Sequence, residues 1–427
     1  MHAFRFPDDF ELGVASAATQ IEGGDTNNSW YDWACSGHIK DGSSPVVAND
    51  HYNRWREDLE LMAAMGIRHS RFGVEWSRIE PEEGHFDEEA LAHYREEISA
   101  MVQAGVRPLL TLHHFTNPRW FEAMGAFENE RCVELYLRFA EKVVRTVGDL
   151  VSEYITINEP NVYTMNGYFG GGWPPGKNSL PLYCRVLTHL TACHIAGYEM
   201  IHRVRREMGY NDTAVSFANH LRVFRPRNTG NPLHRGAAWI SELAFQSSLS
   251  RAMCVGERRF PIGRHPLIRK GKWCDFHAIN YYARSTVSGL ADGVAEGVYV
   301  NDLGWEIYPE GIAEVCRMLY DITPLPLYIT ENGTCDNTDT FRSRYLYEHL
   351  QVLSRCGLPV RRYYHWCFCD NFEWLEGQSA RFGLVHIDYD TQTRTVKDSG
   401  RFYAAMIAEG GVSEDLYETY CRGAYHR

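Results

Sequence analysis

The sequence lacks three features that would direct a first interpretation: a C-x-x-C pair, a long apolar run and an excess of basic residues. Its twelve cysteines are scattered along 427 residues, so we predict neither a zinc site nor a disulfide framework. No segment reaches the ~18 apolar residues of a membrane span, and the first residues lack the apolar stretch of a signal peptide. We therefore expect a cytoplasmic protein with reduced thiols, and we place Cys367 and Cys369 on one face of a core strand.

The charge balance excludes further classes of partner. The 43 basic and 55 acidic residues give a net charge of −12 and are interspersed along the chain. Nucleic acids and anionic membranes are bound by concentrated Lys and Arg, so neither is expected as a main partner. Nothing in the sequence assigns an oligomeric state. With 44% hydrophobic and 13% aromatic residues, the chain has ample material for a large core.

Short apolar strands alternate with longer helical patterns. Helical spacing predicts one helix over 52–65, a second that begins after an N-cap at Asp87 and is ended by Gly105, and a third over 133–147. Glycines follow the first and third helices as stop signals as well. The runs between them have the composition of buried strands. Together with further apolar runs, the strands are predicted at 10–16, 67–74, 107–112, 154–157, 213–218, 275–280, 326–330 and 362–368.

Eight such units without a linker predict one α/β domain over residues 1–427, a single (β/α)8 TIM barrel with catalytic residues at the carboxyl ends of its strands. Length alone would also allow two or three domains. A doubly wound sheet is the rival, but the glycine-rich dinucleotide turn is missing. The Gly/Pro run at 170–177 has the wrong spacing for a phosphate loop, so it is predicted to be an ordinary loop.

Polar and aromatic side chains follow the predicted strands, where a barrel has its active site. Carboxylates can cleave a glycosidic bond, amides and imidazoles bind hydroxyls, and tryptophan stacks on the apolar face of a sugar ring. The pattern thus predicts a sugar site. Its members by strand are Gln20 and Glu22; Arg71, Glu75 and Trp76; His113, His114 and Phe115; Asn158 and Glu159; Asn280, Tyr281 and Tyr282; Glu331 and Asn332; and Trp366, Asp370, Asn371, Glu373 and Trp374.

Each motif also has a plainer interpretation. An isolated glutamate is often a solvated charge, and Asn332-Gly333 is a turn signal in its own right. His113 and His114 are metal ligands by residue type, but adjacent strand residues point to opposite faces, so only one can face a central metal. No matching set of His and Asp completes such a site, and we expect neither a metal nor a cofactor.

Several stretches resemble glycoside hydrolase family 1, the β-glucosidase family, from Phe10 to about Ile407. The run 10–23, FELGVASAATQIEG, resembles the amino-terminal signature of the family. TINEP at 156–160 matches its acid/base motif, and YITENG at 328–333 matches its nucleophile motif. The segment from Trp366 through DNFEW at 370–374 to RFG at 381–383 resembles its sugar-binding segment.

The resemblance implies a role for each matching position. It implies Glu159 as the acid/base and Glu331 as the nucleophile. Arg71 and Tyr282 would hold the nucleophile carboxylate, and Asn158 would bind the sugar 2-hydroxyl. The remaining substrate-binding positions would be Gln20, His114, Asn280, Trp366, Glu373 and Trp374. Phe115 departs from the tryptophan that many relatives have, and the chain is somewhat short, which affects the expected preference for the leaving group.

Retaining glycosidases need two carboxyl groups about 5–5.5 Å apart, one ionised and one protonated. Arg71 would favour the ionised form of Glu331, and the charge of Glu331 would raise the pKa of Glu159. We therefore expect a retaining β-glucosidase that acts on small unphosphorylated β-glycosides, with galactosides or fucosides as secondary substrates. The alternatives are a sugar-binding barrel without hydrolysis and a mainly transglycosylating enzyme.

Overall fold

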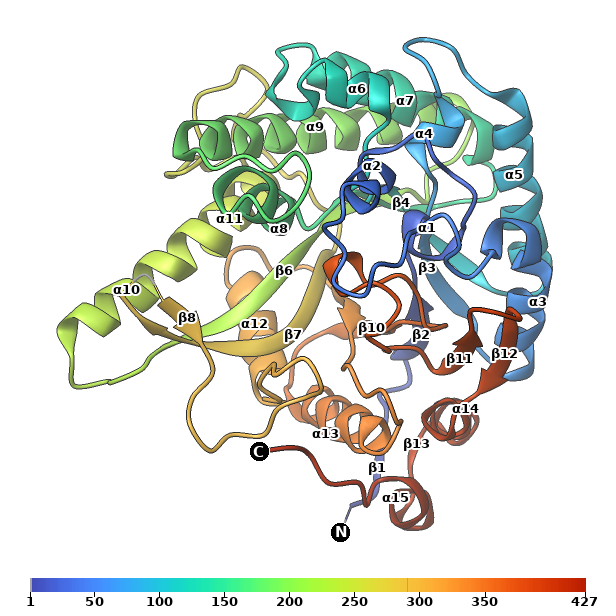
Figure 1. The fold of residues 1–427 in the computed structure, drawn as a ribbon, viewed down its shortest axis with the longest axis vertical. Coiled ribbons are helices and arrows are strands. Elements are labelled where there is room, and N and C mark those ends of the chain that lie inside the picture. The colour runs from blue at the N-terminus through green and yellow to red at the C-terminus, as the bar shows by residue number, and fades with distance from the viewer. Residues whose placement is uncertain (1, 290) are drawn as a thin grey trace.

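The computed structural model describes residues 2–289 and 291–427 and contains a closed barrel of eight parallel strands (Figure 1). The strands are β2 (Glu11–Ala15), β3 (His69–Gly73), β4 (Arg107–His113), β5 (Glu153–Asn158), β6 (Ala214–Pro226), β7 (His277–Ser288), β9 (Leu327–Asn332) and β10 (Val360–Trp366). Each strand pairs with the next one in chain order, β6 with β7 included, and pairing of β10 with β2 closes the ring.

The predicted (β/α)8 barrel is therefore confirmed, and each predicted strand has its counterpart. Strands β6 and β7 are much longer than predicted. They remain paired from Val223 with Arg284 to Pro226 with Val287, beyond the barrel rim. The short strand β8 (Ala291–Gly293) adds antiparallel to the extended end of β7. Figure 1 shows this extension, with α10 (Pro232–Glu242), projecting from one side of the barrel.

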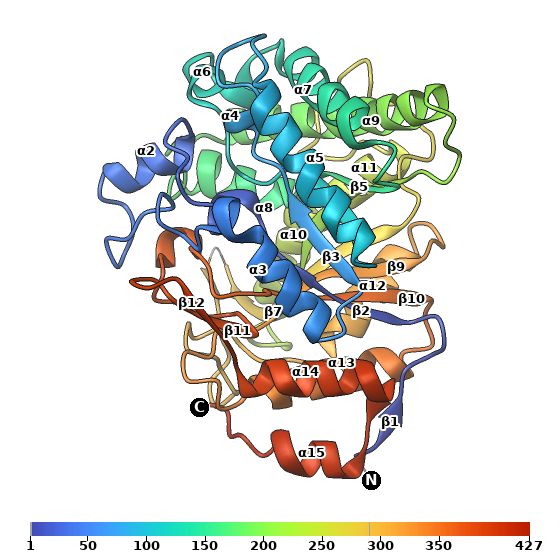
Figure 2. The ribbon, with the colours of Figure 1, turned by 90° about the vertical axis from the view of Figure 1, so that its right-hand side faces the viewer.

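The helices that separate the strands form the outer layer (Figures 1 and 2). In α7, apolar residues from Leu135 to Val147 recur every three or four positions and are buried, which is the pattern of a helix with one face on a sheet. The outer helices are α3 (His51–Ala64), α5 (Glu88–Gln103), α7 (Cys132–Val147), α9 (Leu180–Glu207), α11 (Ser248–Val255), α12 (Gly311–Tyr320), α13 (Arg342–Arg355) and α14 (Asp398–Glu409). The three helices predicted from periodicity are among them, and the side chain of Asp87 caps α5 as expected.

Shorter elements complete the fold. They are the helices α1 (Ala18–Ile21), α2 (Ser29–Cys35), α4 (Trp76–Ile79), α6 (Arg119–Ala123), α8 (Pro160–Thr164) and α15 (Glu414–Tyr420), and the strand pairs β1 (Phe4–Arg5) with β13 (Gly411–Val412) and β11 (Val385–Asp388) with β12 (Thr393–Val396). Within the described residues, no helix combines the length and the apolar character needed to cross a membrane.

The core has an inner and an outer part. Inside the barrel, Leu109, Ile155, Ala278 and Tyr364 pack in one buried cluster. Two larger clusters fill the space between the strands and the surrounding helices. The barrel is thus closed by side chains below its mouth, so a ligand can enter only from the carboxyl ends of the strands.

The prediction for Cys367 and Cys369 was only partly right. Both are buried, but they follow β10, which ends at Trp366. The backbone of Cys367 pairs with Phe382 and Leu384 instead of a barrel strand. The apolar run continues past β10 because the segment after this strand folds over the barrel rim and is also buried.

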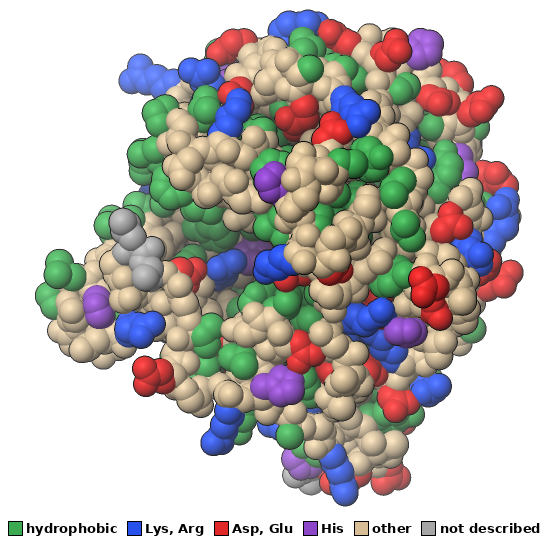
Figure 3. Space-filling model, viewed as in Figure 1, with side chains coloured by type: hydrophobic (Ala, Val, Ile, Leu, Met, Phe, Trp, Pro, Cys, Tyr) green, Lys and Arg blue, Asp and Glu red, His purple; other side chains and the backbone are tan. Residues whose placement is uncertain are grey.

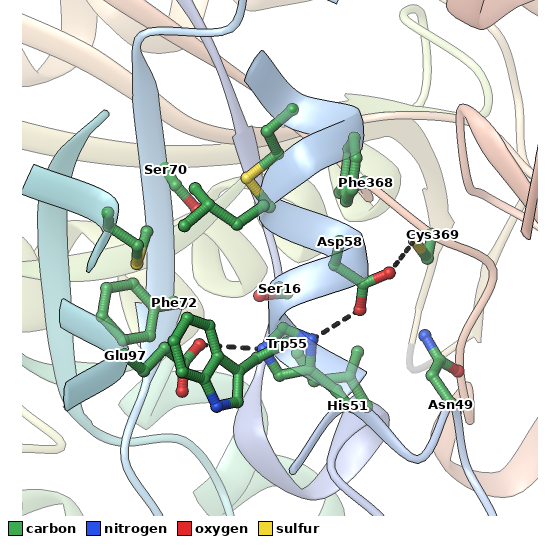
Figure 4. A pocket seen from close by; sticks show the side chains of 14 residues that line it. Ser16, Asn49, His51, Trp55, Asp58, Ser70, Phe72, Glu97, Phe368 and Cys369 are labelled. Atoms are coloured by element: carbon green, nitrogen blue, oxygen red, sulfur yellow. Dashed lines mark hydrogen bonds and ion pairs between the residues drawn. The ribbon is translucent and has the colours of Figure 1, made fainter. Parts of the chain in front are cut away.

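A buried ion cluster lies outside the barrel, between α3 and α5 (Figure 4). The ring of His51 lies between Asp58, at 2.6 Å, and Glu97, at 2.9 Å. Arg394 of β12 also donates to Asp58 at 2.9 Å. Burial disfavours the imidazolium, but the carboxylates Glu97 and Asp58 outweigh it and raise the pKa of His51 to about 10. The ion cluster of His51, Asp58, Glu97 and Arg394 therefore joins α3, α5 and the β11–β12 hairpin.

This cluster predicts a loss of stability at alkaline pH. Because the folded-state pKa of His51 lies above the ordinary value of about 6.5, its contribution is complete below that pH and is lost as the pH rises through about 10. His51→Gln should lower the free energy of unfolding at pH 6 by about 3–5 kcal/mol, and by less at pH 10. Urea unfolding at both pH values measures this, with His85→Gln, at an exposed histidine, as the control. An equal loss at both pH values would contradict the charged state of His51.

Candidate active site

Glu159 lies where β5 passes into α8, at the mouth of the barrel. Its φ is 41°, in the left-handed region that non-glycine residues rarely adopt. The backbone N–H of Glu159 donates to the carbonyl of Ala218 at 2.8 Å, and Pro160 begins the helix. These contacts maintain the unusual backbone, which directs the carboxyl group over the barrel instead of along the strand.

Glu331 ends β9, across the mouth, and both of its carboxylate oxygens are engaged. Arg71 donates to Oε1, and the hydroxyl of Tyr282 donates to Oε2 at 2.6 Å. Two residues on, a Cβ at Gly333 would overlap the carbonyl oxygen of Trp366, so only glycine allows β9 and β10 to end this closely together. The turn motif Asn332-Gly333 thus has a packing role at the edge of the site.

A continuous set of hydrogen bonds joins the two glutamates. Arg71, which also holds Glu331, donates through Nη2 to Asn158 Oδ1 at 2.6 Å. The amide of Asn280 donates to that same oxygen at 3.0 Å and to Glu159 Oε1 at 2.8 Å. Asn280 in turn accepts from Thr330 at 2.7 Å. These predicted site residues therefore form one buried network that joins β3, β7 and β9 to the end of β5.

Burial and hydrogen bonds act in different proportions on the two carboxyl groups. Burial raises the pKa of Glu331 to about 7, against the opposing charge of Arg71, and the charge of Glu159 adds to the rise. Burial also disfavours ionisation of Glu159, but the adjacent His220 and the amide of Asn280 more than offset it and lower its pKa. Each carboxyl group therefore titrates under the influence of the other.

A second group of predicted residues lines the neighbouring part of the mouth. Gln20 Nε2 donates to the carbonyl of Phe372 at 2.9 Å and lies 3.4 Å from Glu373 Oε2. The indole N–H of Trp366 reaches the same oxygen at 3.4 Å. Gln20 Oε1 is buried and has no hydrogen-bond donor among the described residues. Such an unpaired acceptor suits a ligand hydroxyl.

Glu373 is a buried carboxyl group close to two others. Burial, together with the charges of Glu331 and Glu159, raises the pKa of Glu373 to about 8, although Trp366 and Gln20 act in the opposite direction. The neutral acid is therefore more favoured at Glu373 than at an ordinary glutamate. It can donate one hydrogen bond and accept others, which suits the hydroxyl groups of a neutral sugar.

His114, Phe115 and Trp374 form an aromatic wall. The ring of His114 stacks near both Trp366 and Trp374 at 5.9 Å, and its Nε2 lies 3.0 Å from the amide of Asn158. Burial lowers the pKa of His114 well below its ordinary value, with help from the charge of Arg71. Phe115 packs edge-on against Trp374 at 5.2 Å and Trp173 at 5.0 Å.

Several polar residues that follow strands are not part of this site. His113 turns away and contacts Asn117 at 2.9 Å, as alternation on a strand requires. Glu22 accepts from Arg78, Glu75 accepts from Thr19, Asn332 donates to Tyr281, and Asp370 accepts from Lys397. Each therefore serves the packing of a loop or a strand end.

The residue beside the carboxyl group of Glu159 was absent from the predicted set. His220, on β6, lies 3.1 Å from Glu159 Oε1. The predicted strand stopped at residue 218, which left His220 without a place in the barrel. The only available signal was the continued alternation of apolar residues at 221 and 223 along the same run.

The model of glycosyl hydrolase family 1 matches residues 2–258 and 268–412. This chain belongs to that family. Among family 1 relatives, a β-glucosidase from Agrobacterium sp. is 31% identical over 95% of this chain and 96% of its own length. A β-galactosidase from Saccharolobus solfataricus is 27% identical, with 97% of both chains covered.

Solved structures of family 1 agree with these sequence matches. A β-glycosidase from Pyrococcus horikoshii superposes with a TM-score of 0.90, at 32% identity and 98% coverage of both chains. A β-glucosidase from Thermotoga maritima in complex with glucoimidazole has a TM-score of 0.89 at 27% identity, covering 96% of this chain and all of that one. The likeness thus extends over the whole barrel, its mouth included.

Proposed function

We propose that this family 1 protein is a retaining β-glucosidase, with Glu331 as the nucleophile and Glu159 as the acid/base. One observation carries the proposal: two glutamates at the ends of β5 and β9 are joined by one hydrogen-bond network through Arg71, Asn158 and Asn280. Family membership and relatives named β-glucosidase support it. The substrate class is small β-glycosides.

In the first step, a carboxylate oxygen of Glu331 attacks the anomeric carbon while the bond to the leaving oxygen breaks. Glu159 gives its proton to that oxygen. In the second step, water attacks the anomeric carbon and the bond between that carbon and Glu331 breaks. Glu159 takes a proton from the attacking water. Two displacements at one carbon retain the β configuration. Arg71 and Tyr282 orient Glu331 so that one of its lone pairs faces the sugar.

The reacting form has Glu331 ionised and Glu159 protonated, so the pair then holds one proton in total. Activity should therefore follow the fraction of enzyme with a singly protonated pair, which gives a bell-shaped pH profile.

Hydrolysis of nitrophenyl β-glucoside, with the first-formed anomer identified by NMR, tests the proposal. Release of β-glucose supports retention, and release of α-glucose would exclude it. Absence of hydrolysis would favour the sugar-binding barrel. Transfer of most glucosyl units to an added alcohol, at the expense of hydrolysis, would identify a transglycosylating enzyme instead.

We further expect the enzyme to reject 6-phosphorylated glucosides. A phosphate near Glu373 would meet a partly desolvated mouth that already contains Glu159 and Glu331. The kcat/KM for nitrophenyl β-glucoside 6-phosphate should be at least about 100-fold below that of the neutral glucoside, because like charges there cost several kcal/mol. The ratio of kcat/KM for the neutral glucoside to kcat/KM for its 6-phosphate should grow as Glu373 ionises at alkaline pH. A higher kcat/KM for the phosphate would overturn this substrate class.

The proposed compartment is the cytoplasm. Support comes from the twelve cysteines, for which the sequence provides no disulfide spacing, and from free thiols at Cys254 and Cys274 whose sulfurs lie only 3.7 Å apart. Such a close pair is compatible with a reducing environment.

A further inference from the structure

A groove of about 230 Å³ lies beside the sugar pocket, where β6 and β7 run beyond the barrel. Its lining includes His220 and Arg222 from β6, Tyr282 and Arg284 from β7, and Trp305. Figure 3 shows this face hollowed, with basic and acidic side chains gathered at the hollow. Because Tyr282 and His220 both contact the glutamates, the groove opens at the point where a leaving group would depart.

The hydrogen bonds of His220 determine which of its nitrogens bears the proton. Arg222 Nε lies 3.0 Å from His220 Nε2, and a guanidinium N–H can only donate. The Nε2 atom must therefore present its lone pair, so the proton lies on Nδ1. Nδ1 is 3.1 Å from Glu159 Oε1 and donates to it. In this arrangement His220 is the neutral Nδ1–H tautomer.

The ring of His220 is fixed on its remaining sides. It is buried and lies parallel to the ring of Tyr282, at a centroid distance of 5.7 Å and an interplanar angle of 17°. Phe245 packs edge-on against it at 6.0 Å. Arg222 is held in turn, because its backbone N–H donates to Gln246 at 2.9 Å and its Nη1 lies 3.2 Å from Asp292.

The consequence is an asymmetric carboxyl group at Glu159. Oε1 receives two hydrogen bonds, from His220 and from the amide of Asn280. Within the described residues, Oε2 accepts none. A proton on Oε1 would face two donors, so the acidic proton is confined to Oε2. The other charged or titratable groups that face Glu159 are Arg71 from β3, Tyr282 from β7, Glu331 from β9, and Glu373.

We propose that His220 is a positioning residue for proton transfer, held by Arg222 as the Nδ1–H tautomer, and that it restricts the transferable proton of Glu159 to Oε2. The inference rests on the proposed role of Glu159. It also links the leaving-group groove to catalysis, since Arg222 contacts His220 on one side and lines the groove on the other.

The test compares His220→Leu, which removes the donor, with His220→Asn, whose amide can donate from nearly the same position as Nδ1. For an alkyl glucoside, His220→Leu should lower kcat/KM by about 10–100-fold, a part of the 10²–10⁴-fold that a general acid provides. For a dinitrophenyl glucoside, which needs little acid help, the loss should stay below about 3-fold. His220→Asn should recover most of the loss.

The pH profile supplies a readout that a purely structural role would not change. Without the donor, the ionised form of Glu159 is less stable, so the alkaline limb should move to higher pH in His220→Leu and return in His220→Asn. Arg222→Leu should also move the alkaline limb to higher pH. The control is Arg225→Leu, since Arg225 is a half-exposed residue of the same strand that pairs with Glu314, away from the groove.

The outcomes separate this inference from the proposed function. If the wild-type enzyme does not hydrolyse either glucoside, the proposed function fails. If the wild type is active and His220→Leu loses the same factor in kcat/KM for both leaving groups, with an unchanged alkaline limb, the role proposed for His220 is wrong. The role of Glu159 then stands. Circular dichroism and the thermal midpoint of each variant show whether it is folded.

Discussion

Glu331→Gly should lower the turnover of nitrophenyl β-glucoside by at least about 10⁴-fold, because no glycosyl-enzyme can form without the nucleophile. The cavity left by the side chain admits a small anion beside Arg71 and Tyr282, which normally bind the carboxylate. Added azide or formate should therefore restore part of the cleavage of an activated glucoside. Attack by azide directly at the anomeric carbon should give the α-glucosyl product, which NMR identifies.

Glu75→Gln is the matched control for this variant. Glu75 is also a buried glutamate that follows a barrel strand, but its carboxyl group accepts from Thr19 and Ser77, outside the network of the two glutamates. Burial and the charge of Asp25 raise the pKa of Glu75 to about 8, so a neutral amide is a close substitute near pH 7. The control should keep wild-type turnover. Near-normal activity of Glu331→Gly itself would remove Glu331 from the mechanism.

Glu159→Ala should reduce kcat/KM for an alkyl glucoside by about 10²–10⁴-fold, which is the range that general acid help provides. Formation of the glycosyl-enzyme from a dinitrophenyl glucoside should be affected far less, because its leaving group departs without a proton. The second step still lacks its base, so the intermediate should accumulate as a burst of released dinitrophenol. Stopped-flow absorbance measures the burst and the slower steady state separately.

The pH profile of Glu159→Ala should change in a defined direction. In the wild type, activity falls at low pH when both glutamates are protonated and at high pH when both are ionised. Only Glu331 remains in the variant, so the alkaline limb should disappear. The acid limb should remain, because protonation of Glu331 still removes the nucleophile. Equal losses of kcat/KM for the alkyl and the dinitrophenyl glucoside, with an unchanged alkaline limb, would mean that Glu159 is structural.

The sequence alone was sufficient to predict the barrel and most of its mouth. Strand and helix periods depend on neighbouring residues, and Gly66 and Gly105 mark where two helices end. Once eight βα units are counted, the topology brings the carboxyl ends of all strands to one face. Asn158, Glu159 and Glu331 could therefore be assigned to one mouth even though 172 positions separate the two glutamates in the chain.

Two features of the site were decided by the tertiary structure. The pairing of β6 with β7 joins residues some 60 positions apart, and it places His220 opposite Asn280 and against Glu159. The ionisation of Glu159 and Glu331 depends on burial and on which donors reach which oxygen. Motifs specify residue types and local backbone, whereas depth below the surface and contacts between distant segments arise only when the whole chain packs. For this protein, the sequence therefore determined which residues meet at the mouth, and packing determined how they share their protons.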